Sequence, residues 1–158
     1  QVPDEYPLTA AGWRIDDNGR KFIRVKGVRW FTNIDHGRRH EPLPLMTMAD
    51  NLRFSKHKEL KGKTAYDRYD NYDAIEVPFT DAIPSDYDGV MGVPISFLDK
   101  YCPEQFEILG ISLELGIKKP DNLPKEKQGG PAFYIKMGTD YNRMYCRLAI
   151  RRKLTIDN

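Results

Sequence analysis

The sequence is poor in cysteine and lacks any long apolar run. The two cysteines among its 158 residues, Cys102 and Cys146, lie far apart and outside any CxxC pattern. We therefore predict no disulfide framework, expect both side chains to pack as small hydrophobes, and expect a reducing compartment such as the cytoplasm. No apolar stretch approaches the roughly 20 residues that span a bilayer. No charged segment precedes an apolar one, so neither a membrane segment nor a signal peptide is expected.

The sequence also lacks the short motifs of several enzyme and metal-binding classes. None of its four serines lies in a GxSxG motif, and no glycine-rich phosphate or dinucleotide loop is present. The aspartates of residues 67–88 do not have EF-hand spacing. His36 and His40 have the spacing of a helical metal site, but Gly37 and Pro42 oppose a helix and no third ligand is recognisable. We therefore predict neither catalytic nor metal-binding residues in this chain.

Charge is unevenly distributed along the chain, although the formal net charge is only +2. Residues 36–63 hold seven Lys or Arg against three Asp or Glu, a net of +4, and residues 66–88 hold one against seven, a net of −6. Residues 118–153 hold ten against three, a net of +7. Basic blocks beside an acidic one are consistent with a surface that faces a polyanion. Solvated faces that interleave, with the aspartates as a brace, give the same pattern, so charge alone leaves both readings open.

The first part of the chain is predicted to form a β-hairpin followed by a strand. Apolar residues alternate with polar ones around Asp17, Asn18 and Gly19, and Asn-Gly between such runs favours a hairpin because both residues tolerate positive φ. Residues 28–34, VRWFTNI, are β-branched and aromatic. This composition favours a largely buried strand.

The middle of the chain has weaker periodicity. Residues 46–63 are predicted to form an irregular basic loop with at most one helical turn, capped by Asp50 or Asn51. Tyrosines recur at every third position, among aspartates, in residues 65–73. We interpret that stretch as a surface loop that packs tyrosine rings. Residues 74–79, AIEVPF, are predicted to form a short strand that ends near its proline.

The last part of the chain is predicted to contain one helix and two strands. Pro94 suits the first turn of a helix over residues 94–101. The apolar face of this helix would comprise Phe97, Leu98 and Tyr101. Residues 106–112 are predicted to form a strand and residues 116–131 a loop.

The alternation in residues 142–154 predicts a final strand with two unlike faces. The apolar face would comprise Met144, Cys146, Leu148 and Ile150. The basic, aromatic face would comprise Tyr145, Arg147, Ala149 and Arg151. The predicted fold class is therefore α+β and strand-rich, with an N-terminal β-hairpin and a mixed or antiparallel sheet with one or two short helices.

Two long stretches resemble a known family. VRWFTNIDHGRRHE (residues 28–41) and IPSDYDGVMGVPISFLDKYCPEQFEILG (residues 83–110), with YCRLAIRRK near the end, are similar to the C-terminal half of adenine-specific DNA methyltransferases of the EcoRI modification type. The resemblance covers residues 1–115 and 143–153. It implies transfer of a methyl group from S-adenosylmethionine to N6 of an adenine in a short duplex site, with the target base flipped out of the helix.

The chain departs from the family pattern at the catalytic motif. The family uses an Asn-Pro-Pro-Phe type tetrapeptide and a glycine-rich cofactor loop, and this sequence has neither that loop nor any Pro-Pro dipeptide. We therefore expect residues 1–158, which begin with Gln1, to be one C-terminal domain of a larger methyltransferase, inactive alone and without bound S-adenosylmethionine. Its expected parts are a hairpin and core strand (1–35), a basic then acidic loop-rich region (36–90), and a helix with C-terminal strands (91–158).

The resemblance sharpens the hypothesis about DNA contacts. Residues 30–34 would be a late core strand, with Trp30 and Phe31 in the core, and the following loop would emerge at the strand's end, where α/β sheets present loops to ligands. The predicted DNA-contacting residues are Arg38, Arg39, His40, Arg53, Lys56, Lys58, Lys61 and Lys63. Lys and Arg there would neutralise phosphates, and Arg can also read guanine edges. The alternative is that Arg38 and Arg39 pair with the acidic residues 67–88.

Three functional readings stay open. The first is the DNA-contacting part of an N6-adenine methyltransferase, with double-stranded DNA and the missing N-terminal half as partners. The second is a stand-alone DNA-binding module without catalysis, and the third is a β-rich domain that binds an acidic partner protein. Isolated fragments can also pair through exposed sheet edges, so an edge-mediated oligomer is a further possibility.

Overall fold

A computed structural model describes residues 12–23 and 34–153 of the chain. The chain forms two compact units, residues 1–34 and residues 35–158, and each is described by itself. The predicted strand over residues 28–34 falls outside the described residues except for Ile34, as do Trp30 and Phe31. Among the described residues, no helix has the length and apolar character needed to cross a membrane.

The described part of the first unit is the predicted β-hairpin. Strand β1 (Trp13–Ile15) pairs antiparallel with β2 (Lys21–Ile23). The Asp16 carboxylate accepts hydrogen bonds from the backbone N–H groups of Asn18 (3.1 Å) and Arg20 (2.9 Å). Gly19 has a φ of +74°, a conformation that costs glycine little because it has no Cβ. The Asn-Gly signal therefore identified this turn correctly.

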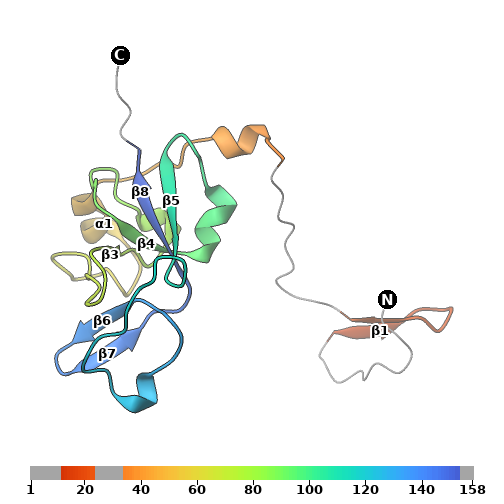
Figure 1. The fold of residues 1–158 in the computed structure, drawn as a ribbon. Coiled ribbons are helices and arrows are strands. Elements are labelled where there is room, and N and C mark those ends of the chain that lie inside the picture. The colour runs from red at the N-terminus through yellow and green to blue at the C-terminus, as the bar shows by residue number, and fades with distance from the viewer. Residues whose placement is uncertain (1–11, 24–33, 154–158) are drawn as a thin grey trace. The chain divides into compact units, whose positions relative to one another are not determined.

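A four-stranded mixed sheet organises the second unit (Figure 1). Its strands, in the order β3-β4-β8-β5, are β3 (Ile75–Glu76), β4 (Met91–Pro94), β8 (Arg147–Arg152) and β5 (Phe106–Ile111). β3 and β4 are parallel, whereas β8 runs antiparallel to both of its neighbours. The strand-rich α+β class is confirmed, and the strands predicted around residues 74–79 and 106–112 are both present.

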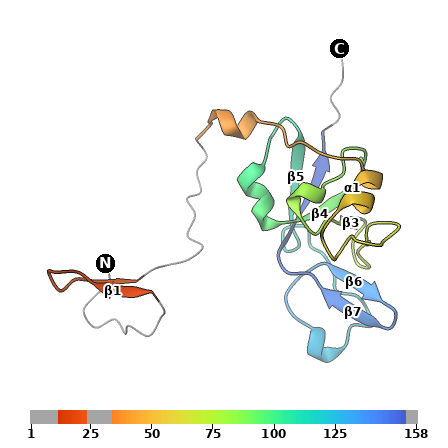
Figure 2. The same cartoon turned by 180° about the vertical axis from the view of Figure 1, so that it is seen from behind.

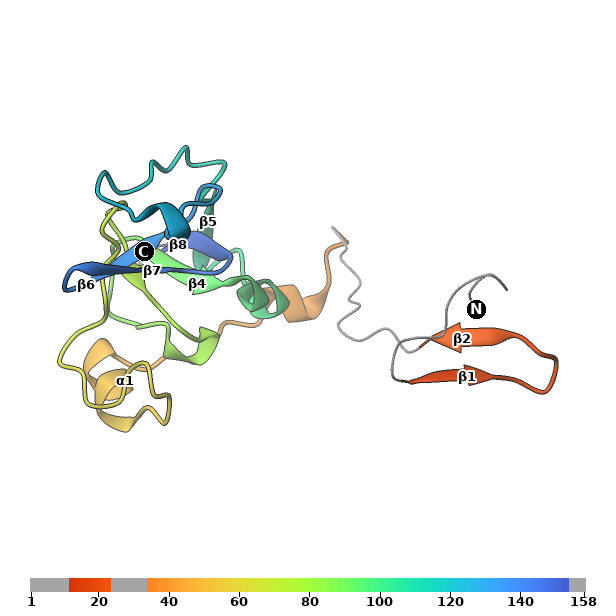
Figure 3. The same ribbon diagram turned by 90° about the horizontal axis from the view of Figure 1, so that it is seen from below.

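The largest apolar cluster lies on one face of this sheet. Met91 pairs with Ile150 across β4 and β8, and both are fully buried. Phe97 and Phe106 pack edge to face against each other within the same cluster, with ring centroids 5.4 Å apart. Ala149 belongs to a second cluster, which also contains Phe133. Helix α1 and the segment between β5 and β6 are seen on opposite sides of the sheet in Figure 3.

Helix α1 (Met48–Phe54) corrects the prediction of an irregular loop over residues 46–63. The N-cap is Thr47, whose hydroxyl oxygen accepts a hydrogen bond from the Asp50 backbone N–H at 3.1 Å, so the helix begins before the predicted caps. The buried Asn51 side chain donates to the Ala82 carbonyl at 3.2 Å. Tertiary contacts on its inner face, rather than local periodicity, stabilise a helix this short.

Short 3-10 helices make up the other helical segments of the described residues. They are η1 (Gly37–His40), η2 (Thr80–Ala82), η3 (Ile95–Lys100) and η4 (Lys125–Lys127). η3 occupies most of the helix predicted over residues 94–101, but Pro94 ends β4 and caps η3 instead of lying in its first turn. Phe97 of η3 is buried as predicted, while Leu98 is 36% exposed.

The tyrosine-rich stretch is a loop with exposed polar residues that packs its tyrosine rings, as predicted, and two of these rings belong to the core. Tyr66 and Tyr69 are both buried. The Tyr66 hydroxyl donates to the Ala82 carbonyl at 2.6 Å, and burial raises the pKa of Tyr66 to about 12. The Tyr69 ring stacks on Phe133, with ring centroids 4.6 Å apart. Asp70 and Asp73, which follow Tyr69 in the sequence, are exposed.

The residues that follow β5 and precede β8 in the sequence form a smaller lobe (Figure 2). This lobe contains the antiparallel hairpin of β6 (Tyr134–Met137) and β7 (Asp140–Arg143). It has its own apolar cluster, which includes Tyr134 and Tyr141. The predicted strand over residues 142–154 is therefore divided: β7 ends at Arg143 and β8 begins at Arg147. Cys146 lies between them and is exposed, whereas Cys102 is buried as expected.

Candidate nucleic-acid interface

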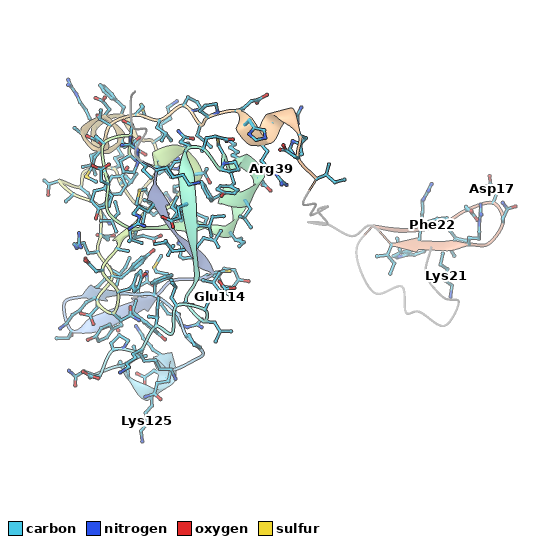
Figure 4. All side chains as sticks on the ribbon, turned by 45° about the horizontal axis from the view of Figure 1, so that its top comes forward. Asp17, Lys21, Phe22, Arg39, Glu114 and Lys125 are labelled. Atoms are coloured by element: carbon cyan, nitrogen blue, oxygen red, sulfur yellow. The ribbon has the colours of Figure 1, made fainter. Side chains whose placement is uncertain are left out.

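The predicted DNA-contacting residues all lie in residues 36–63, which we call the basic segment. The first contact region within this segment is the 3-10 helix η1. η1 has no buried residue and no side-chain cap at its N-terminus. At its ends, the Arg39 N–H donates to the His36 carbonyl at 2.9 Å and the Glu41 N–H donates to the Arg38 carbonyl at 3.4 Å. Arg38 is exposed and Arg39 is half-buried at the position labelled in Figure 4. A short helix of this kind presents cations to solvent but needs outside contacts to hold its shape.

His40, the last residue of η1, lies between two carboxylates. Its Nδ1 is 2.5 Å from an oxygen of Glu104, and its Nε2 is 2.6 Å from an oxygen of Asp35. The hydrogen bonds with Asp35 and Glu104 raise the pKa of His40 above its ordinary value, and the same contact with His40 lowers the pKa of Glu104. Both ring nitrogens are therefore occupied by protein groups, although 44% of the side chain is exposed.

The second contact region comprises the end of α1 and the loop that follows it. The Arg53 guanidinium lies over the Phe54 ring, 5.0 Å from its centroid, and both side chains are exposed. Exposed lysines follow at Lys56, Lys58 and Lys61. Within the described ranges 12–23 and 34–153, these three ammonium groups have no ion-pair partner. They are available to an external anion.

Residues of the acidic segment brace this loop. Lys63, the last of the predicted contact residues, forms an ion pair with Asp67. His57 lies within the basic loop, where its Nε2 is 3.1 Å from an Asp81 oxygen and its ring stacks 3.6 Å from that of Phe79. Two carboxylates of residues 66–88 therefore contact this loop, which is the bracing role that the charge pattern left open.

The arginines of β8, two of which belong to the predicted basic face, all contact acidic side chains. Arg147 donates through Nε and Nη2 to one oxygen of Glu76, at 2.9 and 2.8 Å, and Tyr69 donates to the other carboxylate oxygen. Burial opposes the charge on Arg147, but the hydrogen bonds and charge of Glu76 outweigh it and leave the pKa of Arg147 raised. Arg151 pairs with Glu107 at 2.8 Å, and Arg152 lies 3.7 Å from Asp88.

A cleft of about 660 Å³ borders the basic segment beside the β6–β7 hairpin. Its lining includes Leu60, Lys63, Phe79, Lys136, Met144 and Arg147. No group of three or more His, Cys, Asp or Glu side chains in the described part of the chain is placed to hold a metal ion. Three carboxylates, of Glu59, Asp67 and Glu76, line the cleft together with these cations, and Asp67 and Glu76 form ion pairs with Lys63 and Arg147.

Sequence reasoning missed the groups that position the first contact region. Gln105 accepts from the Leu43 N–H at 2.8 Å and donates to the Leu43 carbonyl at 2.9 Å, while the adjacent Glu104 binds His40. His40 and Glu104 are 64 positions apart, so no local pattern could connect them. Asp35 was visible five residues before His40, but a carboxylate and a histidine at that spacing have many other roles.

Comparison with known proteins shows to which class of enzymes and to which family the chain is related. The chain is similar to type II methyltransferases, which are enzymes of restriction–modification systems. Residues 1–153 match the family described as adenine-specific methyltransferase EcoRI, and the chain belongs to this family. The recognition of an EcoRI-type adenine methyltransferase from sequence is thereby confirmed.

Three relatives illustrate the similarity. The type II methyltransferase M.EcoRI of Escherichia coli is 43% identical over 120 residues, which cover 76% of this chain and 33% of the relative. M.MgeORF184P of Mycoplasma genitalium is 40% identical over 92 residues (58% of this chain, 26% of the relative). M.MpnI of Mycoplasma pneumoniae is 36% identical over 95 residues (60% and 27%). The match thus spans a third or less of each relative, and no solved structure matches the chain.

Proposed function

We propose that this chain is the C-terminal, DNA-contacting part of an S-adenosylmethionine-dependent methyltransferase that modifies N6 of adenine in double-stranded DNA. Family membership supports the reaction class. The observation that carries the DNA-contacting role is the basic segment, in which Arg38, Arg53, Lys56, Lys58 and Lys61 are all exposed. Other residues of the segment, His40, His57 and Lys63, contact carboxylates of the protein instead.

The cofactor and the reacting groups are proposed to belong to the other part of the enzyme. Binding of S-adenosylmethionine in this class needs a glycine-rich loop after a strand, and the sequence contains no such loop. In the described sheet, the one parallel pair is β3 and β4, whose connection contains a 3-10 helix, η2. These residues do not fit the cofactor, and we derive no catalytic step from this chain. We expect no methyl transfer by the chain alone.

The role of the basic segment follows from polyelectrolyte physics. Each phosphate that Lys or Arg neutralises releases condensed counterions, and the logarithm of the binding constant falls with the logarithm of salt concentration by about 0.9 per phosphate on B-DNA. Such contacts position the protein, while base contacts specify the site. The adenine must leave the stack before its amino group can react, and firm backbone contacts help to hold the distorted duplex.

The test replaces Arg38 and Arg39 by Ala together in the complete enzyme. If both side chains contact phosphates, the salt slope should fall by about 1.8, with weaker binding to specific and non-specific duplexes alike. A matched control replaces Lys118 and Lys119, two consecutive exposed cations of the small lobe. Fluorescence anisotropy over a salt series measures both slopes. An unchanged slope in the arginine variant, or an equal fall in the control, contradicts the assignment.

A further inference from the structure

The geometry around His40 requires a protonated ring. Both ring nitrogens lie within 2.6 Å of a carboxylate oxygen, on Glu104 and on Asp35. A carboxylate accepts but does not donate, and only imidazolium carries an N–H on both nitrogens. In the neutral tautomers one nitrogen would present its lone pair to a carboxylate, which is repulsive. The two contacts therefore exist together only while His40 is charged.

The two contacts attach His40 to two different segments, the residues just before η1 and the turn just before β5. Asp35 precedes η1, so its bond to His40 closes a loop around Arg38 and Arg39. Glu104 lies on the turn before β5, next to Gln105, whose side chain binds both backbone groups of Leu43. His40 and Leu43 are thus attached to adjacent residues of one turn. The Gln105 contacts do not depend on protonation, whereas the His40 contacts do.

We infer that His40 is a positioning residue that, as imidazolium between Asp35 and Glu104, fixes the Arg38–Arg39 turn for DNA contact and makes that contact pH-dependent. The inference rests on the proposed function and replaces a direct DNA contact by His40. Because His40 uses both nitrogens within the protein, it reaches DNA only by giving up one of these bonds. Arg38 and Arg39 are the groups that act on the ligand.

The sign of the pH dependence follows from the charges around the ring. The negatively charged carboxylates of Asp35 and Glu104 contact the His40 ring, and the cations of Arg38 and Arg39 lie in the same 3-10 helix. The neighbouring segment contributes the Cys102 thiol, which donates to Glu104 at 3.2 Å, and Tyr101, whose pKa is raised by burial while the charge of Arg39 acts to lower it. The two carboxylates raise the pKa of His40 in the folded protein. We call the two contacts of His40 with Asp35 and Glu104 the clamp. Both contacts are therefore formed below the ordinary histidine pKa of 6.5, and they are lost as pH rises through the higher pKa that His40 has in the folded protein.

The decisive variant is Glu104→Gln in the complete enzyme, with DNA affinity measured between pH 6 and 8.5 (about the range in which histidine titrates). If the clamp operates, this variant should bind DNA about two- to five-fold more weakly at pH 6, a loss typical of exposed ion pairs. The change in DNA affinity between pH 6 and 8.5, which we call the pH step, should also become smaller. A direct DNA contact by His40 predicts the opposite, since removing a negative charge beside the DNA strengthens binding. Glu126→Gln, exposed on η4, is the matched control for loss of one negative charge.

Two further variants complete the test. His40→Gln removes the ion pairs with both carboxylates, so it should bind at least as weakly as Glu104→Gln and show little pH dependence. The double variant should lose no more than His40→Gln alone, because the ion pair with Glu104 is already absent from His40→Gln. Glu104→Asp should restore part of the pH step. Stronger binding by Glu104→Gln, or an unaltered pH step, overturns the inference while leaving the proposed function intact. Absence of salt-dependent DNA binding by the unaltered enzyme overturns both.

Discussion

The buried contact between Glu76 and Arg147 gives the sharpest stability prediction. The Glu76 side chain is 5% exposed and that of Arg147 is 14% exposed, and Tyr69 donates a further hydrogen bond to the same carboxylate. Glu76→Ala leaves a largely buried guanidinium without its counter-charge and a buried hydroxyl without its acceptor. Removal of one partner from such a pair costs roughly 3–5 kcal/mol in the free energy of unfolding. For a chain of this size, that loss lowers Tm by about 6–20 °C.

A matched control is offered by a second glutamate whose arginine partner lies on the same strand, β8, as Arg147. Glu107 pairs with Arg151 of β8 at a similar distance, but these side chains are 45% and 49% exposed, so Glu107→Ala should cost only about 0–1 kcal/mol. Urea unfolding followed by circular dichroism compares the two variants. A combined Glu76→Leu and Arg147→Met variant should recover most of the loss, since it leaves no unpaired charge. Equal destabilisation by Glu76→Ala and Glu107→Ala would refute the reasoning.

Two further predictions concern the tyrosines of the core. Gly92 of β4 lies against the Tyr69 side chain, which occupies the space of a Cβ, so Gly92→Ala should destabilise the fold by about 1–3 kcal/mol in urea unfolding; an unchanged midpoint would contradict the packing. Burial raises the pKa of Tyr66 to about 12, so the stability linked to its protonation is complete below the ordinary value of 10.0 and is lost as pH rises to about 12. Tyr66→Phe should remove this part of the alkaline destabilisation, which ultraviolet absorbance and unfolding midpoints measured together can detect.

Elements with a strong local signal were predictable from the sequence. The hairpin β1–β2 follows from Asn18–Gly19, because this turn needs a residue that accepts positive φ. That requirement is local and does not depend on contacts with the rest of the chain. The strand β5 follows from the apolar run of residues 106–112. The prediction of at most one helical turn in residues 46–63 was wrong because α1 depends on distant partners. Its Asn51 side chain donates to the Ala82 carbonyl, and Asp86 accepts from the Met48 N–H at 2.7 Å.

Alternation identified β8 but not the use of its polar face. Leu148 and Ile150 point into the main core as predicted, whereas Arg147 on the other face is bound by Glu76. A strand pattern shows which residues share a face and does not show what covers it. The carboxylate within AIEVPF was the available hint, since an acidic residue in a buried strand needs a partner.

The sequence by itself determined the family, the hairpin turn and the location of the basic segment, since each of these depends on residue identity within short stretches. Only the tertiary structure decided which cations of that segment remain outward and which are restrained. Lys63 pairs with Asp67, His57 is held by Asp81, and His40 lies between Asp35 and Glu104. The physical reason is that an ion pair depends on distance in space, and folding brings together charges, such as those of His40 and Glu104, that lie 64 positions apart in the chain.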